Sequence, residues 1–249
     1  MALARQHGRV DVEALALQFA VTPQTIRKDL NELCDRKLLN RLHGGAAYPS
    51  GVSNYAYEAR RMLAAESKRR IGLAAAAMIP DESSLILNIG TTTEQVAMAL
   101  RRHTGLMVVT NNINAANILR EVPSAEVVIA GGVVRHADGG VVGEAAVDFI
   151  RQFRVDYAVI GASAIDADGT LLDFDFREVK VAQAIIETAR KTILVADAMK
   201  FERTAPVRIG HLEQLDVFVT DQPPSPAIAA LCAAAGVELH IANQGMPPR

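Results

Sequence analysis

The feature of this sequence that most limits its fold is an alternation of short apolar runs and longer amphipathic segments after Ser83. The apolar runs, which we predict to be strands, cover residues 85–89, 106–110, 127–130, 157–161, 192–196, 217–220 and, as a possible last strand, 237–241. Helices are expected between them, at residues 92–102, 113–121, 143–152, 176–190 and 225–235. Such an alternation is typical of a mostly parallel sheet covered on both faces. It predicts an α/β domain for the larger part of the chain.

A short segment near the N-terminus has a different character. Thr22 is a favourable N-cap, because its hydroxyl can accept a hydrogen bond from a free backbone N–H of the first turn. Pro23 follows at the first helical position, where its missing N–H does no harm. Ile26, Leu30 and Leu33 then recur at helical spacing. We therefore expect an amphipathic helix that begins at Pro23 and packs these three side chains on a core.

The opposite face of this helix is polar and basic. It would present the side chains of Thr22, Gln24, Thr25, Arg27, Lys28 and Asn31. Side chains of these types bind phosphates and the edges of base pairs, so the helix is a candidate reader of double-stranded DNA. An ordinary amphipathic surface helix would show the same pattern, and this segment alone does not separate the two.

The residues before this helix complete a known DNA-binding layout. Asp11 is placed to cap an earlier helix, and Ala20-Val21 make a tight turn into Thr22. Two short helices joined by such a turn form a helix-turn-helix, in which the second helix enters the major groove.

The residues after the helix are typical of a β-hairpin. Residues 38–43 have strand character, and Gly44-Gly45 are the residues that a tight hairpin turn prefers. A hairpin in this position would be a wing. We expect Arg41 and His43, near its tip, to contact phosphate or the minor groove.

Charge is divided unevenly along the chain. Residues 1–70 contain 12 lysines and arginines against 7 aspartates and glutamates, a net of +5. Residues 71–249 contain 14 against 21, a net of −7. A basic front piece on an acidic body is typical of a nucleic-acid-binding module joined to another domain, although a chance division of surface charge would look the same.

The domain boundary is expected at Pro49-Ser50-Gly51, a run of turn-forming residues. We predict a DNA-binding domain at 1–50, a linker helix at 51–66 and a second domain at 67–249. That second domain should open with a helix at 66–78 whose charged run, Lys68 to Arg70, lies in solvent. Direct contact of this run with DNA is the alternative.

Composition excludes several classes of protein. No apolar run approaches the ~20 residues that span a bilayer, and the N-terminus lacks the layout of an export signal. Cys34 and Cys232 lie far apart and the six histidines are scattered, so no metal-ligand spacing is present. We expect a cytoplasmic protein with free thiols and with no metal, cofactor or membrane partner.

The loop after the first predicted strand has the character of an anion site. Gly90 allows close backbone approach, the helix that follows presents free N–H groups, and Thr91, Thr92 and Thr93 add hydroxyl donors. Such a helix start binds phosphate well. Plain capping by threonine is the alternative, and neither a Walker A loop nor a dinucleotide fingerprint is present.

Polar residues also follow the other predicted strands. They are Thr110, Asn111, Asn112, Gly131, Gly132, Arg135, Asp166, Asp173, Glu178 and Lys200. Each of these residues alone could simply stabilise a turn. Because the carboxyl ends of parallel strands meet at one edge of a sheet, we expect these residues and the phosphate loop to bind a small phosphorylated polyol or sugar.

The same residues leave an enzymatic reading open. A sugar-phosphate isomerase needs a base for a proton next to a carbonyl and an acid for its oxygen. Asp166, Asp173 or Glu178 could be that base, with Lys200 as an electrostatic partner. The basic front piece favours a regulator over an isomerase with an accessory DNA-binding module.

Several motifs together resemble one protein family. They are Thr22-Pro23-Gln24-Thr25-Ile26-Arg27-Lys28-Asp29-Leu30 with His43-Gly44-Gly45-Ala46, then Ile89-Gly90-Thr91-Thr92, Thr110-Asn111-Asn112, Ala130-Gly131-Gly132, Gly140-Val141-Val142-Gly143, Asp168-Gly169 and Asp197-x-x-Lys200-Phe201. With these motifs in this order, the chain resembles the DeoR family of bacterial transcription regulators over nearly its full length. The run from Gly139 to Arg154 is similar to the branch of that family that responds to glycerol-3-phosphate.

The resemblance implies a repressor and not an enzyme. Its expected parts are a winged helix-turn-helix and a sensor domain similar in fold to ribose-5-phosphate isomerase. The implied partners are operator DNA, a phosphorylated effector that releases it, and further copies of the chain in a homodimer or homotetramer. DNA-reading roles would carry over to Gln24, Thr25, Arg27 and Lys28, and phosphate-binding roles to Gly90, Thr91, Thr92 and Thr93.

Two departures from the family pattern stand out. Asn88 occupies a position where the family often has aspartate, which removes a negative charge beside the phosphate loop. Met1 falls inside the first helix of the family pattern, so either the start is misassigned or the helix is truncated. If the helix is truncated, it is expected to brace the DNA-reading helix less well.

Overall fold

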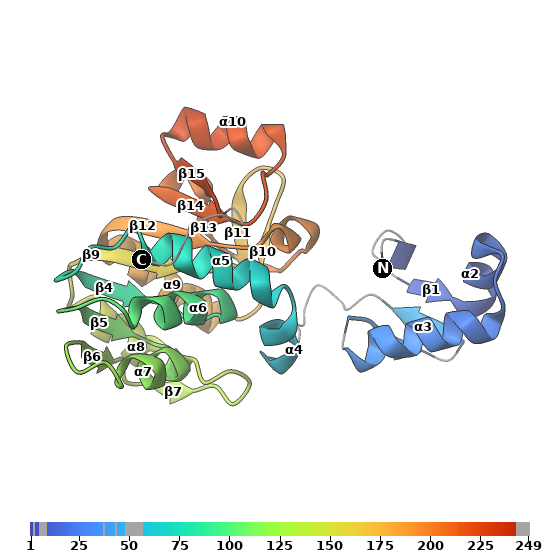
Figure 1. The fold of residues 1–249 in the computed structure, drawn as a ribbon, viewed down its shortest axis with the longest axis horizontal. Helices are drawn as coiled ribbons and strands as arrows, with labels where there is room; N and C mark the ends of the chain where they lie inside the picture. The colour runs from blue at the N-terminus through green and yellow to red at the C-terminus, as the bar shows by residue number, and fades with distance from the viewer. Residues whose placement is uncertain (2, 5–8, 37, 43, 48–56, 243–249) are drawn as a thin grey trace. The chain divides into compact units, whose positions relative to one another are not determined.

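The computed structural model of the chain describes residues 1, 3–4, 9–36, 38–42, 44–47 and 57–242. The chain divides into two compact units, Met1–Leu63 and Ala64–Arg249. Figure 1 shows the elements of both units with their labels. None of the helices among the described residues is long and apolar enough to cross a membrane.

The N-terminal unit is a small helical domain with an antiparallel sheet. Its elements are β1 (Arg9–Asp11), α2 (Val12–Phe19), α3 (Pro23–Asp35), β2 (Asn40–Leu42), β3 (Gly45–Ala47) and α4 (Tyr57–Met62). The strands lie in the order β1-β3-β2. The predicted helix-turn-helix and hairpin are therefore confirmed. Strand β1 was not predicted, because three residues are too few to show a period of two.

The C-terminal unit is built on a seven-stranded sheet. The strands are β4 (Ser84–Leu87), β5 (Met107–Thr110), β6 (Glu126–Ile129), β9 (Val155–Ile160), β12 (Ala189–Val195), β14 (Val217–Thr220) and β15 (Glu238–Ile241). All neighbouring strands are parallel, in the order β15-β14-β12-β9-β4-β5-β6 (Figure 1). The chain thus starts at β4, fills the sheet to one side, and returns to β9 on the other side. The predicted parallel sheet, including its last strand, is confirmed.

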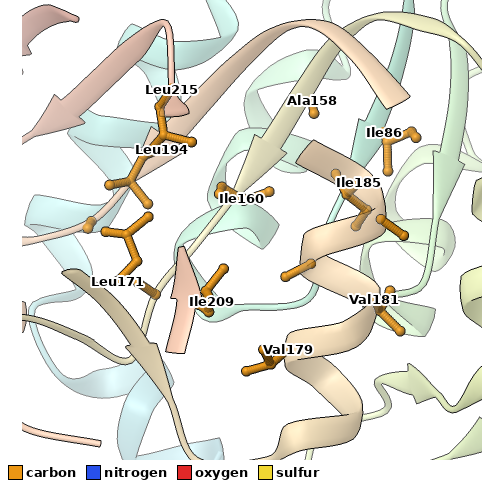
Figure 2. Packing of buried hydrophobic residues seen from close by; sticks show 14 of the residues in the cluster. Ile86, Ala158, Ile160, Leu171, Val179, Val181, Ile185, Leu194, Ile209 and Leu215 are labelled. Atoms are coloured by element: carbon orange, nitrogen blue, oxygen red, sulfur yellow. The ribbon is translucent and has the colours of Figure 1, made fainter. Parts of the chain in front are cut away.

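Helices cover both faces of this sheet, because alternate residues along each strand point to opposite faces. The helices are α5 (Ala65–Ala76), α6 (Thr91–Leu100), α7 (Ile113–Leu119), α8 (Glu144–Ile150), α9 (Phe176–Thr188) and α10 (Pro226–Ala235). Leu85 and Leu87 pack in a core with residues of α5, α6 and α7. Ile86, between them, packs in a second core with residues of α8, α9 and α10. Figure 2 shows part of that second core, in which Ile185 of α9 lies near Ile86.

Two antiparallel excursions leave the carboxyl ends of the strands. One is the hairpin of β7 (Val133–Val134) and β8 (Val141–Val142). The other is a three-stranded sheet of β10 (Ala164–Ile165), β11 (Thr170–Asp173) and β13 (Val207–His211). Two short 3-10 helices, η1 (Ala198–Glu202) and η2 (Leu212–Gln214), precede and follow β13. The sequence pattern predicted neither excursion, since their strands are short and separated by only a few residues.

One prediction about the start of the C-terminal unit was wrong. Lys68, expected in solvent, is only 3% exposed. It lies on the same face of α5 as Ile71 and Gly72, at the i, i+3 and i+4 spacing that brings side chains together. Arg69 is exposed, as expected, and pairs with Glu66 at 2.7 Å.

Candidate DNA-reading surface and effector site

The start of helix α3 has the predicted cap. Thr22 Oγ1 accepts a hydrogen bond from the backbone N–H of Thr25 at 3.2 Å, and Pro23 occupies the first turn. Ile26 and Leu30 are buried in the core of the N-terminal unit, and Leu33 packs against it. The helix is therefore fixed by its apolar face, which leaves the other face to solvent.

The polar face of α3 is exposed throughout. Its exposed residues are Thr22, Gln24, Thr25, Arg27, Lys28 and Asn31. The Arg27 guanidinium lies 3.2 Å from Glu13 Oε1 of α2, and both side chains are more than half exposed. An exposed pair of this kind contributes little to stability, so Arg27 is available to other anions.

The wing is held close to the first strand. Gly44 adopts a left-handed backbone at the hairpin turn, with φ of 78°. A Cβ on Gly45 would lie 2.1 Å from the carbonyl oxygen of Val10, so only glycine fits there. Arg41 is exposed on β2 and lies 3.7 Å from Asp35. His43, the other predicted contact, lies outside the described residues.

In the C-terminal unit, the loop after β4 leads directly into α6. Gly90 has φ of 144°, which favours glycine, and helix α6 begins at Thr91 without a side-chain cap. Thr93 is fully buried, and its hydroxyl donates a 2.8 Å hydrogen bond to the carbonyl of Gly90. Thr93 thus holds the shape of the loop.

The hydroxyls of Thr91 and Thr92, unlike that of Thr93, do not bond to the loop. Their exposed fractions are 7% and 6%. Within the part of the chain that the structure describes, neither hydroxyl has a hydrogen-bond partner. Neither hydroxyl oxygen is among the fully buried side-chain atoms without a partner, so both keep some access to solvent. Beside the free N–H groups of a helix start, two such hydroxyls suit an anionic ligand.

Three polar residues lie at the carboxyl end of β5, the strand next to β4. The Thr110 hydroxyl donates to the carbonyl of Leu87 at 2.7 Å, and Asn112 caps α7. Asn111 donates to the carbonyl of Val141, while its Oδ1 is buried and lacks a partner. Thr110 and Asn112 mainly position the loops here. Asn111 keeps an unused acceptor.

The two glycines after β6 lead into the β7–β8 hairpin. Both Gly131 and Gly132 are exposed, and Gly132 has φ of 149°. A Cβ on Gly132 would lie 3.0 Å from the carbonyl oxygen of Val142. These glycines allow the chain to turn from the sheet edge into the hairpin.

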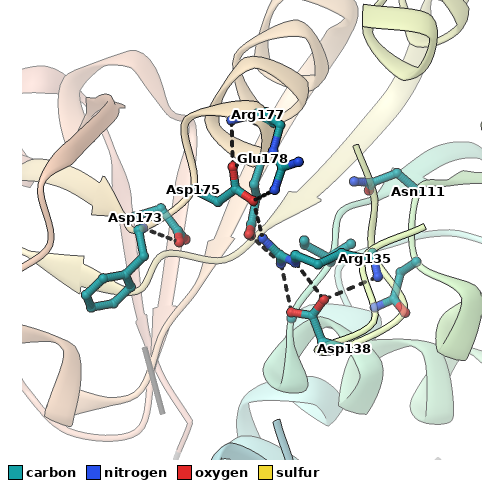
Figure 3. A network of polar contacts seen from close by, with 12 residues as sticks. Asn111, Arg135, Asp138, Asp173, Asp175, Arg177 and Glu178 are labelled. Carbon is teal, nitrogen blue, oxygen red and sulfur yellow. Dashed lines mark hydrogen bonds and ion pairs between the residues drawn. The ribbon is translucent and has the colours of Figure 1, made fainter. Parts of the chain in front are cut away.

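A network of carboxylates surrounds Arg135 in this hairpin (Figure 3). The guanidinium binds Asp138 through Nε at 2.9 Å and Nη2 at 2.8 Å. It also lies 3.2 Å from Asp175 Oδ2 and 2.6 Å from Glu178 Oε2. Asp173, at the end of β11, is 5% exposed and close enough to affect Glu178.

These contacts shift the pKa values of the cluster. Burial, together with the negative charge of Asp173, raises the pKa of Glu178 to about 8. Hydrogen bonds from Arg177 lower the pKa of Asp175 to about 2. Burial by itself would lower the pKa of Arg135, but Asp138 and Glu178 raise it. Carboxyl groups in one cluster are thus held in different protonation states near neutral pH.

Further contacts join the cluster to the phosphate loop. Asn114 Nδ2 of α7 donates to Glu94 Oε1 in the first turn of α6 and to the carbonyl of Asp138, both at 3.1 Å. A Cβ on Gly140 would lie 2.8 Å from the side chain of Ile89, the residue before Gly90. The loop and the carboxylates therefore lie side by side at one edge of the sheet.

One predicted effector residue, Asp166, lies apart from these contacts. Asp166 is exposed in the turn between β10 and β11, and that turn lies at the far end of the β10–β11 excursion from Asp173. Lys200 is half-buried in η1, which packs against β10, the strand paired with β11, so it lies on the side of the site that ends in Asp173. Sequence reasoning did not include Asp138, Asp175 or Asn114 among the effector-binding residues. Asp175 could have been found, because it precedes a predicted helix as an N-cap would.

Comparisons with known proteins agree with this organisation. Residues 1–52 match the family described as DeoR-like helix-turn-helix domain, and residues 63–222 match the DeoR C terminal sensor domain. The glycerol-3-phosphate regulon repressor of Escherichia coli (strain K12) is 44% identical over 239 residues, which cover 96% of this chain and 95% of that protein. A protein of the same name from Haemophilus influenzae is 49% identical over 222 residues, which cover 89% and 87%.

Solved structures with a similar fold include an enzyme. A ribose-5-phosphate isomerase in complex with phospho-erythronic acid aligns over 55% of this chain and 54% of that chain. Its TM-score is 0.41 and its sequence identity is 19%.

Proposed function

Because the chain belongs to the DeoR family of DNA-binding transcriptional repressors, we propose that a phosphorylated polyol releases it from its operator. Glycerol-3-phosphate is the favoured effector, since relatives at 44% and 49% identity are named for its regulon. The observation that carries the proposal is the start of α6, where Thr91 and Thr92 have hydroxyls without a hydrogen-bond partner among the described residues, beside backbone N–H groups that no side chain caps.

Operator binding is assigned to α3 and the wing. The exposed side chains on this surface are Thr22, Gln24, Thr25, Arg27, Lys28, Asn31 and Arg41. Arginine and lysine bind phosphates and guanine edges, and glutamine and asparagine suit adenine edges. We also assign His43 to this surface, on the basis of its position in the sequence alone. One helix reads few base pairs, so a homodimer or homotetramer on repeated half-sites is expected.

Effector binding is assigned to the edge of the parallel sheet. The Gly90–Thr93 loop offers N–H and O–H donors that suit a phosphate. Beside it, the carboxylates around Arg135 are hydrogen-bond acceptors that suit hydroxyl groups. Donors at one end and acceptors at the other match a small molecule that carries a phosphate and free hydroxyls. Arg135 serves this site mainly by holding the carboxylates in place.

Release follows from linkage between the two sites. The effector binds one conformation of the sensor more tightly, and that conformation spaces paired DNA-reading helices wrongly for the operator. A tenfold to hundredfold loss of operator affinity corresponds to roughly 1.4–2.7 kcal/mol of coupling. The hairpin that carries Arg135 touches both α9 and α7, so it is well placed to respond to the ligand.

A thermal-shift screen of phosphorylated polyols and sugars tests the effector assignment. A ligand that binds the native state raises the unfolding midpoint by mass action. Glycerol-3-phosphate should raise it at millimolar concentration, while glycerol and sulfate at the same concentration should not. A screen in which no phosphorylated polyol shifts the midpoint would remove the effector assignment.

An isomerase is the second candidate, because Asp173 and Glu178 are largely buried carboxyl groups in a cluster where the pKa of Glu178 is raised. Asp166 lies apart from that pair, which removes one of the residues that such chemistry was expected to use. Incubation of the full chain with ribose-5-phosphate decides between the two. Turnover to ribulose-5-phosphate would favour the enzyme, and binding without turnover would favour the repressor.

A further inference from the structure

Gly161 directly follows β9, at a position where nothing in the protein requires a glycine. Among the glycines that the structure describes, only Gly131 and Gly161 lack both a positive φ and a neighbouring atom that a Cβ would approach within 3.0 Å. Gly131 is exposed, so the space beside it is open solvent. Gly161 is half-buried, yet a Cβ there would have no neighbour closer than 3.9 Å. Room for a methyl group therefore remains over this half-buried backbone.

This room lies where the sheet changes direction. Strands β4 and β9 are neighbours, but the chain continues from β4 to one side of the sheet and from β9 to the other. Ligands of open parallel sheets bind beyond the carboxyl ends of the strands at such a switch point. A Cβ on Gly161 would lie 4.0 Å from the carbonyl oxygen of Ile89 and 4.0 Å from Cγ2 of Thr93. The room over Gly161 therefore adjoins the candidate phosphate loop.

Resting on the function proposed above, we propose that Gly161 determines specificity, because its missing side chain leaves room for the carbon chain of the phosphorylated effector. The atoms nearest this room are the carbonyl oxygens of Ile89 and Val195 and the methyl group of Thr93. A carbonyl oxygen accepts a hydrogen bond from a hydroxyl group, whereas a phosphate dianion has no hydrogen to donate. The polyol part of the effector therefore lies over Gly161, and its phosphate lies at the start of α6.

The loop that begins at Gly161 leads to the far end of the candidate site. The backbone N–H of Ser163 donates to the carbonyl of Leu172 on β11 at 3.0 Å, and β11 ends at Asp173. A ligand that starts at the phosphate loop and passes over Gly161 therefore runs toward the carboxylate end of β11.

Calorimetric titration of the full chain with glycerol-3-phosphate compares the wild type with Gly161→Ala. The added methyl group takes up the room and should weaken binding by about tenfold to a hundredfold, the usual effect of overpacking. The melting temperature without effector should stay the same or rise slightly, because alanine fits the space and restricts the unfolded chain. Ser124→Thr also adds one methyl group, on the exposed turn before β6, and should bind the effector as the wild type does.

A second measurement keeps the glycine in place. Labelling of isoleucine carbonyl carbons and glycine nitrogens with NMR-active isotopes selects the amides of glycines that follow isoleucine, which are Gly72, Gly90, Gly161 and Gly210. Titration with glycerol-3-phosphate should shift the signals of Gly90 and Gly161 and leave that of Gly210, on β13, in place. Ile160→Val identifies the Gly161 signal, because it removes the labelled carbonyl before this glycine.

The outcomes separate this inference from the function on which it rests. If glycerol-3-phosphate neither binds the wild type nor shifts any of the four signals, the effector assignment and this inference both fall. If it shifts Gly90 but not Gly161, or if Gly161→Ala binds it as tightly as the wild type, the effector assignment stands and the role of Gly161 is wrong. A sharp fall in the melting temperature of Gly161→Ala would show that the protein itself needs this glycine, which also contradicts the inference.

Discussion

The guanidinium of Arg135 lies 2.6 Å from Glu178 Oε2 and so joins the β7–β8 hairpin to the start of α9. The two residues are 43 positions apart, and both side chains are mostly buried. Truncation of Arg135 would leave three buried carboxylates without their shared cation. We therefore expect the contact to matter both for the stability of the sensor and for the chemistry of the candidate effector site.

Arg135→Met should destabilise the sensor by roughly 3 kcal/mol, because breaking a buried ion pair leaves uncompensated charge. Arg135→Lys should cost less, since it keeps the charge but loses the bidentate contact with Asp138. Urea denaturation followed by circular dichroism measures both. Arg154→Met, at an exposed arginine of the same unit, is the matched control. Equal stability of the Arg135 and Arg154 variants would contradict the account.

Glu178 should make stability depend on pH in a definite direction. Its pKa rises from 4.5 to about 8 on folding, because of burial first and Asp173 second. The folded chain therefore holds this proton more tightly than the unfolded chain does. The resulting contribution of Glu178 to the free energy of unfolding is fully present below about pH 4.5 and is lost as the pH rises to about 8. The stability of the wild type relative to Glu178→Gln should fall between pH 5 and pH 8.5. The measurement is the melting temperature of both proteins at each pH. If the difference between wild type and Glu178→Gln does not change with pH over this range, Glu178 does not have the raised pKa.

The double variant Thr91→Ala with Thr92→Ala should abolish release by the effector while operator binding persists. Neither hydroxyl has a hydrogen-bond partner among the described residues, so the double variant should remove the proposed ligand contacts and disturb no protein hydrogen bond that the structure shows. Fluorescence anisotropy with operator DNA, with and without glycerol-3-phosphate, measures both properties. Thr204→Ala, at an exposed threonine of the same unit, should respond as the wild type does. Normal release of the operator by the double variant would refute the assignment of phosphate binding to the Gly90–Thr93 loop.

Arg27→Ala should weaken operator binding by ~1–3 kcal/mol if Arg27 reads a base edge. Its exposed pair with Glu13 costs little to break, so the side chain is available to DNA. Arg36→Ala, at the far end of α3, should have a smaller effect, because recognition helices contact bases mainly through their N-terminal residues. Operator affinity that Arg27→Ala leaves unchanged would remove this residue from the reading surface.

The sequence predicted the elements better than their assembly. All seven strands of the parallel sheet and the Thr22 cap followed from apolar runs and capping chemistry. The order of the strands did not, because long-range pairing leaves no local pattern. Lys68 was misplaced for a related reason: a charged residue is expected in solvent, whereas the helical position of Lys68 puts it on the face with Ile71.

The candidate effector site shows the same limit. The Gly90–Thr93 loop was visible in the sequence, since a strand, a glycine and a helix start are adjacent there. The cluster around Arg135 joins segments about 40 residues apart, so only folding brings Asp138 and Glu178 together. Asp166 and Asp173 looked equivalent in sequence. The unpredicted β10–β11 hairpin places Asp166 on its exposed turn, while Asp173 is buried at the other end of the hairpin.

The most direct measurement of the central claim is a titration of the repressor–operator complex with glycerol-3-phosphate, followed by fluorescence anisotropy. The account predicts release of the DNA at millimolar or lower effector, with operator affinity reduced by about tenfold or more, and no release with glycerol. Operator affinity that stays constant at saturating glycerol-3-phosphate, under conditions in which calorimetry shows the effector bound, would contradict it.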